Sequence, residues 1–341
     1  MKTLLQVKDL AVSYFTYAGE VQAVRGVSFD VEKNQTVAIV GESGCGKTVT
    51  AKSIMGLIKK PGIVDENSQI LFQGENLVRY TKKQWNNFCG KECGMIFQDA
   101  LVSLNPTMKV GKQIIENLDN HEPSLSKEEK KARAVEILKL AGIADAEQCL
   151  EKYPHELSGG MRQRVMIGMA LVTNPKLLIA DEPTTALDVT IQAQIMELLK
   201  DLQNKLHMSI ILITHDLGVV ADIADFIVVM YAGKIVERGS CREIFYHASH
   251  PYTWALLKSV PRIDYNGQTL VTIEGSIPDM TNPPKGCAFC KRCPYAMHIC
   301  KEHEPSKWDL GDGHEVSCWL MDERADREGV PFETGRRVGN E

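Results

Sequence analysis

The chain has 341 residues, with 39 Lys and Arg against 44 Asp and Glu, a formal net charge of −5 and 44% hydrophobic residues. This length predicts two domains, or one large domain with an appendage, and the composition is that of a folded globular protein. The negative charge argues against nucleic acid as the main partner. No apolar run approaches the roughly 18–20 residues of a membrane span, and no signal peptide begins the chain. We therefore expect a soluble protein of the cytosol.

The sequence predicts strands that alternate with helices. In chain order, the expected strands are residues 5–12, 36–40, 177–180, 210–214 and 226–230. The expected helices are residues 47–57, 126–140, 158–172 and 190–206, and Ser126 and Glu129 have the spacing of a capping box. This alternation favours an α/β architecture with a largely parallel core sheet. After about residue 260 the sequence is rich in Pro, Gly and Cys, so we predict one domain over residues 1–260 and an extension over 261–341.

A glycine-rich turn lies where the predicted strand 36–40 meets the predicted helix 47–57. It fits the Walker A pattern G-x-x-x-x-G-K-[ST], with the residues Gly41, Glu42, Ser43, Gly44, Cys45, Gly46, Lys47 and Thr48. Glycines allow successive backbone N–H groups to turn around phosphate oxygens, and the helix N-terminus adds its positive end. We expect Lys47 to reach the β- and γ-phosphates of ATP and the Thr48 hydroxyl to bind Mg²⁺.

A predicted strand that ends in two carboxylates supplies the acidic partner of such a loop. Asp181 follows the apolar residues 177–180 and is expected to hold Mg²⁺, directly or through water. Glu182 comes next and is placed to polarise the water that attacks the γ-phosphate. A strand that ends in solvated acids is the alternative, and the Walker A pattern favours the catalytic interpretation.

Residues 157–163, Leu-Ser-Gly-Gly-Met-Arg-Gln, resemble the signature motif of ABC-type ATPases. The resemblance implies a P-loop ABC-ATPase cassette with a RecA-like α/β core, an antiparallel β subdomain and an α-helical signature subdomain. It identifies Gln98 as the Q-loop glutamine and a Mg²⁺ or water ligand, Asp188 as the D-loop aspartate and His215 as the switch histidine. It also implies that Tyr14 stacks on adenine, with Tyr17 as the alternative.

The signature residues form a second anion-binding surface. Ser158 is a natural N-cap, and Gly159 and Gly160 expose backbone N–H groups at a helix start. In the family this surface closes over the γ-phosphate bound to the other subunit, so one chain does not form a complete site. Met161 stands where the family most often has Gln, and the backbone donors do not depend on that side chain.

Residues 40–43, 153–158, 161–167, 250–253 and 284–294 resemble the importer ATPases for oligopeptides, dipeptides and nickel. The resemblance implies an ATPase that powers import of di- or oligopeptides, with a nickel or other small-solute importer as the alternative. It implies a sibling ATPase as heterodimer partner, two transmembrane permeases, an extracytoplasmic solute-binding protein and a peripheral location on the cytoplasmic face of the membrane. A soluble ABC ATPase that acts on ribosomes or DNA is the alternative from another class, and a single cassette without heptads or a basic patch argues against it.

Five of the ten cysteines lie in the predicted extension. Cys287, Cys293, Cys300 and Cys318 can supply four thiolates to a [4Fe–4S] cluster or to a structural Zn²⁺. Their spacing differs from the paired C-x2-C of zinc ribbons, and the family resemblance also favours the cluster. Cys290 is an additional cysteine that leaves zinc and uncoordinated thiols open. The nearby histidines are alternative ligands, although solvated loop positions suit them better: His298, His303 and His314.

Overall fold

The computed structural model describes residues 2–98, 103–185, 187–259 and 273–331. The chain divides into two compact units. Unit 1 comprises Met1–Leu5, Val31–Thr36 and Phe72–Ile213, and unit 2 comprises Gln6–Asp30, Val37–Leu71 and Thr214–Glu341. Within the described ranges, no helix has both the length and the apolar character needed to cross a membrane.

Three buried parallel strands form the sheet of unit 1. They are β7 (Cys93–Ile96), β8 (Leu177–Asp181) and β9 (Ser209–Thr214), hydrogen-bonded in the order β7-β8-β9. Every residue in these strands is buried, which explains their almost continuous apolar sequences. In this register Asp181 lies opposite Ile213 at the carboxyl end of the sheet.

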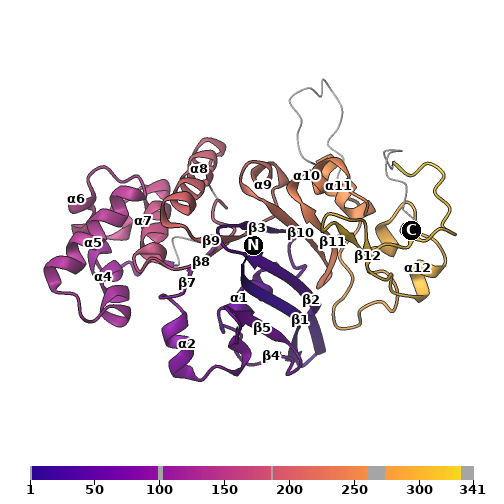
Figure 1. The fold of residues 1–341 in the computed structure, drawn as a ribbon, viewed down its shortest axis with the longest axis horizontal. Coiled ribbons are helices and arrows are strands. Elements are labelled where there is room, and N and C mark those ends of the chain that lie inside the picture. The colour runs from indigo at the N-terminus through magenta and orange to yellow at the C-terminus, as the bar shows by residue number, and fades with distance from the viewer. Residues whose placement is uncertain (1, 99–102, 186, 260–272, 332–341) are drawn as a thin grey trace. The chain divides into compact units, whose positions relative to one another are not determined.

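The helices of unit 1 include a bundle in which α4, α5, α6 and α7 pack on one another, drawn in magenta and pink in Figure 1. The bounds of the helical elements are α2 Lys82–Phe88, α4 Val110–His121, α5 Lys127–Leu140, α6 Ala146–Glu151, α7 Gly159–Leu171 and α8 Val189–Leu206, with short 3-10 turns η1 Leu77–Arg79 and η2 Pro154–Glu156 and the short strand β6 Glu75–Asn76. Ser126 accepts a hydrogen bond from the N–H of Glu129, and the side chain of Glu129 bonds back to Ser126. The predicted capping box is therefore confirmed.

Unit 2 begins with a sheet in which β1 lies between β2 and β5, and β4 pairs antiparallel with β1. The bounds are β1 Thr3–Thr16, β2 Gly19–Glu32, β4 Gly62–Val64 and β5 Gln69–Phe72. The strand β3 (Thr36–Val40) leads into the helix α1 (Lys47–Ile54). The sequence predicted that this helix continues to residue 57. It ends earlier because Gly56 adopts φ 63, a left-handed conformation that terminates helices.

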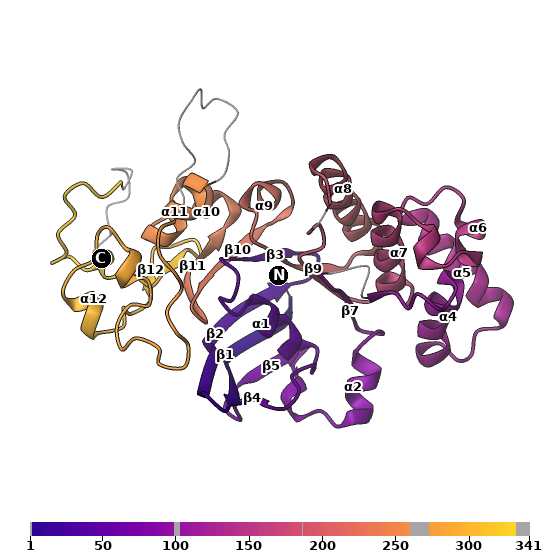
Figure 2. The same ribbon diagram turned by 180° about the vertical axis from the view of Figure 1, so that it is seen from behind.

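A second sheet in unit 2 joins the C-terminal residues to the rest of the unit. Its order is β12-β13-β11-β10-β3, with β3 parallel to β10 and the other pairs antiparallel (Figure 2). The bounds are β10 Phe226–Tyr231, β11 Lys234–Ser240, β12 Trp308–Asp309, β13 Glu315–Val316, α9 Leu217–Ile223, α10 Cys241–Tyr246, α11 Pro251–Ser259, α12 Ile299–Glu302, η3 Cys290–Arg292 and η4 Trp319–Met321. The predicted boundary at residue 260 lies outside the described residues.

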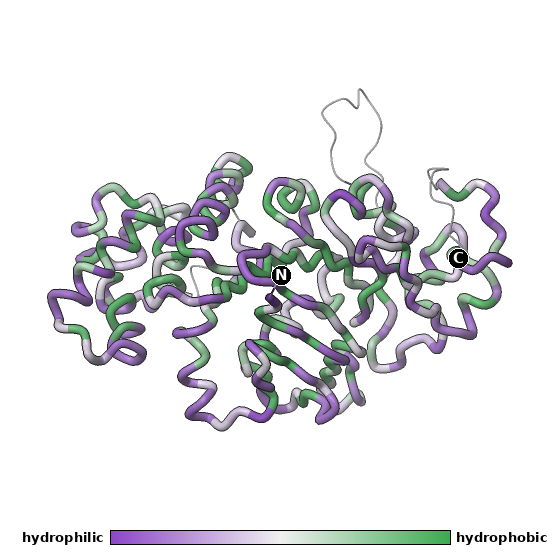
Figure 3. Tube along the Cα trace, in the orientation of Figure 1, coloured by the Kyte–Doolittle hydropathy of each residue, from purple (hydrophilic) through white to green (hydrophobic). Residues whose placement is uncertain are grey.

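One hydrophobic cluster of unit 2 includes residues from both sides of that boundary. Val40 of β3, Val229 of β10 and Tyr252 of α11 pack in the same cluster as Phe289. Figure 3 shows that the trace of residues 273–331 mixes polar and apolar residues. The C-terminal extension therefore gains part of its core from packing against β3, β10 and α11.

Candidate functional site

The loop of residues 41–48, called the phosphate loop below, connects β3 to α1. Gly46 is the N-cap of α1 with φ 103, and Gly41 has φ 149. A Cβ atom at Gly46 would lie 2.6 Å from the carbonyl oxygen of Ala23, and one at Gly41 would lie 2.2 Å from that of Met230. Both positions therefore need glycine for backbone conformation and for space.

The ammonium of Lys47 lies inside the curl of the phosphate loop. Its Nζ donates to the carbonyl oxygens of Gly41 at 2.7 Å and Glu42 at 3.0 Å, and the side chain is 4% exposed. Cys45 is buried, and burial raises the pKa of its thiol. Ser43 and Gly44 are exposed at the tip, and Thr48 is half-buried in the first turn of α1. The loop thus presents a fixed positive charge and backbone donors, the chemistry that a phosphate group requires.

Glu182, a member of the predicted catalytic group, is constrained in both its side chain and its backbone. It follows Asp181, which ends β8 and is 3% exposed, and it has φ 47. Its Oε2 accepts hydrogen bonds from the Gln98 side-chain amide and from the Thr185 hydroxyl, each at 2.9 Å. Left-handed backbone is uncommon for Glu, and such strain concentrates at functional sites. The structure thus brings two predicted residues, Gln98 and Glu182, into direct contact.

The signature residues begin helix α7 as predicted. The Ser158 hydroxyl accepts a hydrogen bond from the N–H of Met161 at 3.3 Å, while Gly159 and Gly160 form the first turn. Asp188 likewise caps α8 by accepting from the N–H of Ile191 at 3.0 Å. The neighbouring D-loop residue 186 lies outside the described residues.

Sequence reasoning missed a residue that links the signature helix to the catalytic carboxylate. The buried amide of Gln163, on α7, donates a hydrogen bond to the carbonyl oxygen of Pro183, which directly follows Glu182. The only sequence signal was its place at the end of the Leu-Ser-Gly-Gly-Met-Arg-Gln motif, which did not reveal its partner.

The remaining predicted nucleotide residues lie in unit 2 with the phosphate loop, whereas Gln98, Asp181 and Glu182 lie in unit 1. Tyr14 is half-buried on β1 opposite Gly62, and a Cβ at Gly62 would come within 2.7 Å of its ring. Tyr17, the alternative, is fully exposed. His215 is exposed directly after β9.

The five cysteines of the extension line a single pocket in unit 2, together with His250, Tyr295 and Trp319. Burial, and secondarily the neighbouring thiols, raise the pKa of Cys287 to about 12 and that of Cys293 to about 11. The pKa of Cys318 is also raised, first by burial and then by its thiol neighbours Cys287, Cys293 and Cys300. The four cysteines predicted as ligands are thus mutual neighbours.

This thiol pocket is lined by the four cysteines predicted as ligands and by Cys290. Among the described residues, no three His, Cys, Asp or Glu side chains are arranged to hold one metal ion. Four cysteine thiolates can hold either a structural Zn²⁺ or a [4Fe–4S] cluster. All ten cysteines are free thiols, so the pocket residues are chemically available for either.

The histidines of the extension differ from one another in burial. His298 and His303 are exposed, as predicted for loop positions. For His314 the prediction of a solvated loop residue is wrong. It is fully buried, with Nε2 2.8 Å from Oε1 of Glu237 and Nδ1 3.5 Å from Oε2 of Glu243. His314 directly precedes β13, whose pairing with β11 brings it beside Glu237 in the interior, away from a role as metal ligand.

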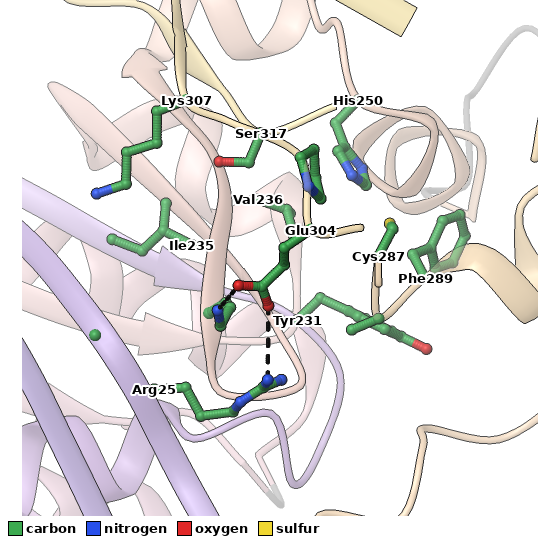
Figure 4. Close-up of a pocket in the computed structure, with 14 residues that line it drawn as sticks. Arg25, Tyr231, Ile235, Val236, His250, Cys287, Phe289, Glu304, Lys307 and Ser317 are labelled. Carbon is green, nitrogen blue, oxygen red and sulfur yellow. Dashed lines mark ion pairs between the residues drawn. The ribbon is translucent and has the colours of Figure 1, made fainter. Parts of the chain in front are cut away.

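A second cavity, of about 160 Å³, lies beside the thiol pocket in unit 2 (Figure 4). Arg25 and Lys234 both form ion pairs with Glu304 at its wall, at 3.6 and 2.5 Å. His250, Cys287 and Phe289 line both hollows.

Two family models match the chain: "ABC transporter" over residues 24–185, and "Oligopeptide/dipeptide transporter, C-terminal region" over residues 236–300. The oligopeptide transport ATP-binding protein OppD of Bacillus subtilis is 60% identical over 93% of this chain and 89% of that protein. The dipeptide transport ATP-binding protein DppD of the same organism is 52% identical over 96% of this chain and 97% of that protein. OppD of Escherichia coli is 48% identical over 89% of both chains.

Solved structures of ABC transporter cassettes share the fold. The dimeric structure of the bacterial cassette MJ0796 aligns with a TM-score of 0.62 and 26% identity, covering 70% of this chain and 99% of that one. CbiO1 from Clostridium perfringens, part of the transporter complex cbiONQ, aligns with a TM-score of 0.62 and 30% identity, covering 72% of this chain and 91% of that one. The predicted cassette fold is confirmed.

Proposed function

The chain belongs to the ABC transporter family of ATP-binding proteins, and from that premise we propose that it is the ATP-hydrolysing subunit of a peptide importer. It is an ABC ATPase, and ATP with Mg²⁺ is its expected ligand. The peptide assignment is supported by its 60% identity to a relative named for oligopeptide transport. Hydrolysis is supported by one contact above all, the hydrogen bond from Gln98 to the strained Glu182.

The proposed chemistry assigns a role to each residue of the phosphate loop and the catalytic group. The loop N–H groups and Lys47 bind the β- and γ-phosphates, and Tyr14 stacks on adenine. Bound Mg²⁺ would neutralise developing phosphate charge, held by Thr48, Gln98 and Asp181. Glu182 accepts the proton of the attacking water.

Two further contacts complete the proposed nucleotide site. His215 hydrogen-bonds the γ-phosphate from the end of β9. The helix start formed by Ser158, Gly159 and Gly160 binds the γ-phosphate held by a partner cassette, because it presents backbone donors and the positive end of α7. Asp188 lies at the same dimer interface. A complete site therefore needs two cassettes.

The proposed assembly contains a sibling ATPase in a heterodimer, two transmembrane permeases and an extracytoplasmic solute-binding protein. The chain would lie peripherally on the cytoplasmic face of the membrane, with residues 1–260 as the cassette and residues 261–341 as an extension. In that extension we assign Cys287, Cys293, Cys300 and Cys318 as holders of a [4Fe–4S] cluster, with Zn²⁺ as the alternative occupant. Four neighbouring thiols around one pocket, of which those of Cys300 and Cys318 are buried and those of Cys287 and Cys293 half-buried, support this assignment.

Affinity purification of the tagged chain from detergent-solubilised membranes of its own cell tests the assembly. We expect a second ATPase and two permeases in equal amounts, and ATP hydrolysis that rises when the binding protein is added with a peptide. Stimulation by nickel instead would favour the nickel importer. Recovery with ribosomes or DNA, without permeases, would overturn the proposal.

A further inference from the structure

Glu42, the second residue of the phosphate loop, is held from three sides. Its carboxylate accepts two hydrogen bonds from Arg292, with Nη1 2.7 Å from Oε2 and Nη2 2.9 Å from Oε1. Its N–H donates to the Tyr252 hydroxyl at 2.8 Å, and its carbonyl oxygen accepts from Lys47 at 3.0 Å. A residue bound through side chain, N–H and carbonyl has little freedom, so groups outside the loop fix where the loop begins.

Arg292 uses its full hydrogen-bonding capacity in this contact. Besides the two bonds to Glu42, Nε donates to the carbonyl oxygen of Glu274 at 2.8 Å, Nη1 to the Tyr231 hydroxyl at 3.2 Å and Nη2 to the carbonyl oxygen of Ile273 at 3.0 Å. A guanidinium has five N–H donors, and here each has an acceptor. The side chain of Arg292 is 6% exposed and that of Glu42 25%, so this is a bidentate ion pair that is largely shielded from water.

The pair joins the C-terminal extension to the phosphate loop. Arg292 and Glu42 are separated by 250 positions in the sequence, and Arg292 lies between two cysteines of the thiol pocket, Cys290 and Cys293. Three aromatic rings pack against one another beside this contact. They are those of Tyr231, Tyr252 and Phe289, with centroids 4.7 to 5.3 Å apart. The guanidinium carbon lies 5.7 Å from the Tyr231 centroid.

We propose that Arg292 is a positioning residue of the nucleotide site, which acts through Glu42 to shape the phosphate loop and to neutralise a carboxylate beside the phosphates. The inference rests on the proposed function of this loop as the ATP site. Without the guanidinium, the Glu42 carboxylate repels the phosphates of ATP, and the loop loses its anchor. Both effects weaken ATP binding, so they raise Kd and KM more than they lower kcat.

Titration of the full-length chain with a fluorescent ATP analogue and Mg²⁺ tests this. We expect Arg292→Gln to weaken binding about tenfold, within the usual range of coupling between two sites. Arg292→Lys should have a Kd between those of the wild-type chain and Arg292→Gln, because lysine keeps the positive charge but lacks the planar guanidinium with its paired donors. Adding Glu42→Gln to Arg292→Gln should recover part of the affinity, because it removes the uncompensated charge.

A matched control comes from the same extension. Arg324 pairs with a carboxylate, Asp322, at 2.8 Å, but its side chain is 86% exposed. Arg324→Gln therefore makes the same chemical change and should leave Kd unchanged. If Arg292→Gln does not fold, the Kd of Arg292→Lys is compared with that of the control instead.

The outcomes separate this inference from the proposed function. A lower melting temperature with unchanged Kd in the Arg292 variants, or no recovery on adding Glu42→Gln, would assign Arg292 a purely structural role and overturn the inference. Failure of the wild-type chain to bind the analogue would overturn the ATP site itself. In the assembled transporter, a rise in KM at nearly constant kcat is the expected result.

Discussion

The side-chain amide of Gln98 donates a 2.9 Å hydrogen bond to Oε2 of Glu182, the oxygen that also accepts from Thr185. The two donors fix the orientation of a carboxylate whose backbone has the unusual φ of 47°. A general base must point at the proton that it removes. A carboxylate whose orientation is fixed in this way can accept a proton from a water molecule at one position only. Gln98 follows β7 and Glu182 follows β8, so parallel strands bring the two residues together.

The contact predicts the effect of a charge at position 98. Gln98→Glu replaces the donor to Glu182 by a second carboxylate, and the two like charges repel each other. We expect ATP hydrolysis by the assembled transporter to show a larger loss of kcat in Gln98→Glu than in Gln98→Ala. The alanine variant is the matched control because it removes the hydrogen bond without adding a charge. Equal losses in the two variants would contradict the contact.

The glycines of the phosphate loop predict a graded loss of nucleotide binding. Gly46 and Gly44 both have positive φ, but a Cβ at Gly46 meets Ala23 O at 2.6 Å, whereas one at Gly44 meets nothing within 4 Å. Gly46→Ala therefore has to move the backbone, while Gly44→Ala carries only conformational strain of about 1 kcal/mol. We expect titration with ATP to show a much larger rise in Kd for Gly46→Ala. Equal losses would show that packing on Ala23 does not shape the loop.

The arrangement of the cysteines predicts which of them bind the proposed cluster. Cys318 has the other three predicted ligands as its thiol neighbours. Iron, acid-labile sulfide and zinc should be measured in chains purified without oxygen. We expect Cys318→Ser to lose the iron and sulfide and Cys290→Ser to keep them. A colourless wild-type chain with one zinc would contradict the cluster, and loss of iron in Cys290→Ser would change the ligand set.

Replacing the buried His314 is expected to lower the stability of the fold without loss of bound metal. His314 lies 2.8 Å from the fully buried carboxylate of Glu237, which also accepts from the N–H groups of Ser249 and His250. His314→Ala removes one hydrogen-bonding partner of a buried carboxyl group, so we expect the free energy of unfolding in urea to fall by about 2–3 kcal/mol. His298→Ala, at an exposed position, is the control. Loss of bound metal under native conditions in His314→Ala would show that His314 is a ligand after all.

Local sequence patterns predicted the elements that depend on neighbouring residues. Glycine spacing and the apolar strand before it located the phosphate loop, and Ser126 with Glu129 located the start of α5, because both signals act within a few residues. The helix α1 was predicted too long because the left-handed Gly56 was not recognised as its end.

Contacts between distant residues could not be predicted in this way. Arg292 and Glu42 are 250 positions apart, and only the folded chain shows that they pair. His314 was expected in solvent because the weak two-residue strand β13 gave no signal of its pairing with β11. The same holds for Gln163, whose partner Pro183 is 20 positions away in the turn after β8.

The central claim, that this chain hydrolyses ATP to import peptides, is tested most directly by uptake of a radiolabelled peptide into vesicles. The vesicles contain the assembled transporter with its binding protein, and either the wild-type chain or Glu182→Gln. We predict ATP-dependent peptide uptake with the wild-type chain and a fall in ATP turnover of about 10²–10⁴-fold with Glu182→Gln, which keeps its ATP affinity. Glu197→Gln, at an exposed position on α8, is the control and should transport normally. Near-normal turnover in Glu182→Gln, or wild-type vesicles that hydrolyse ATP without accumulating peptide, would contradict the account.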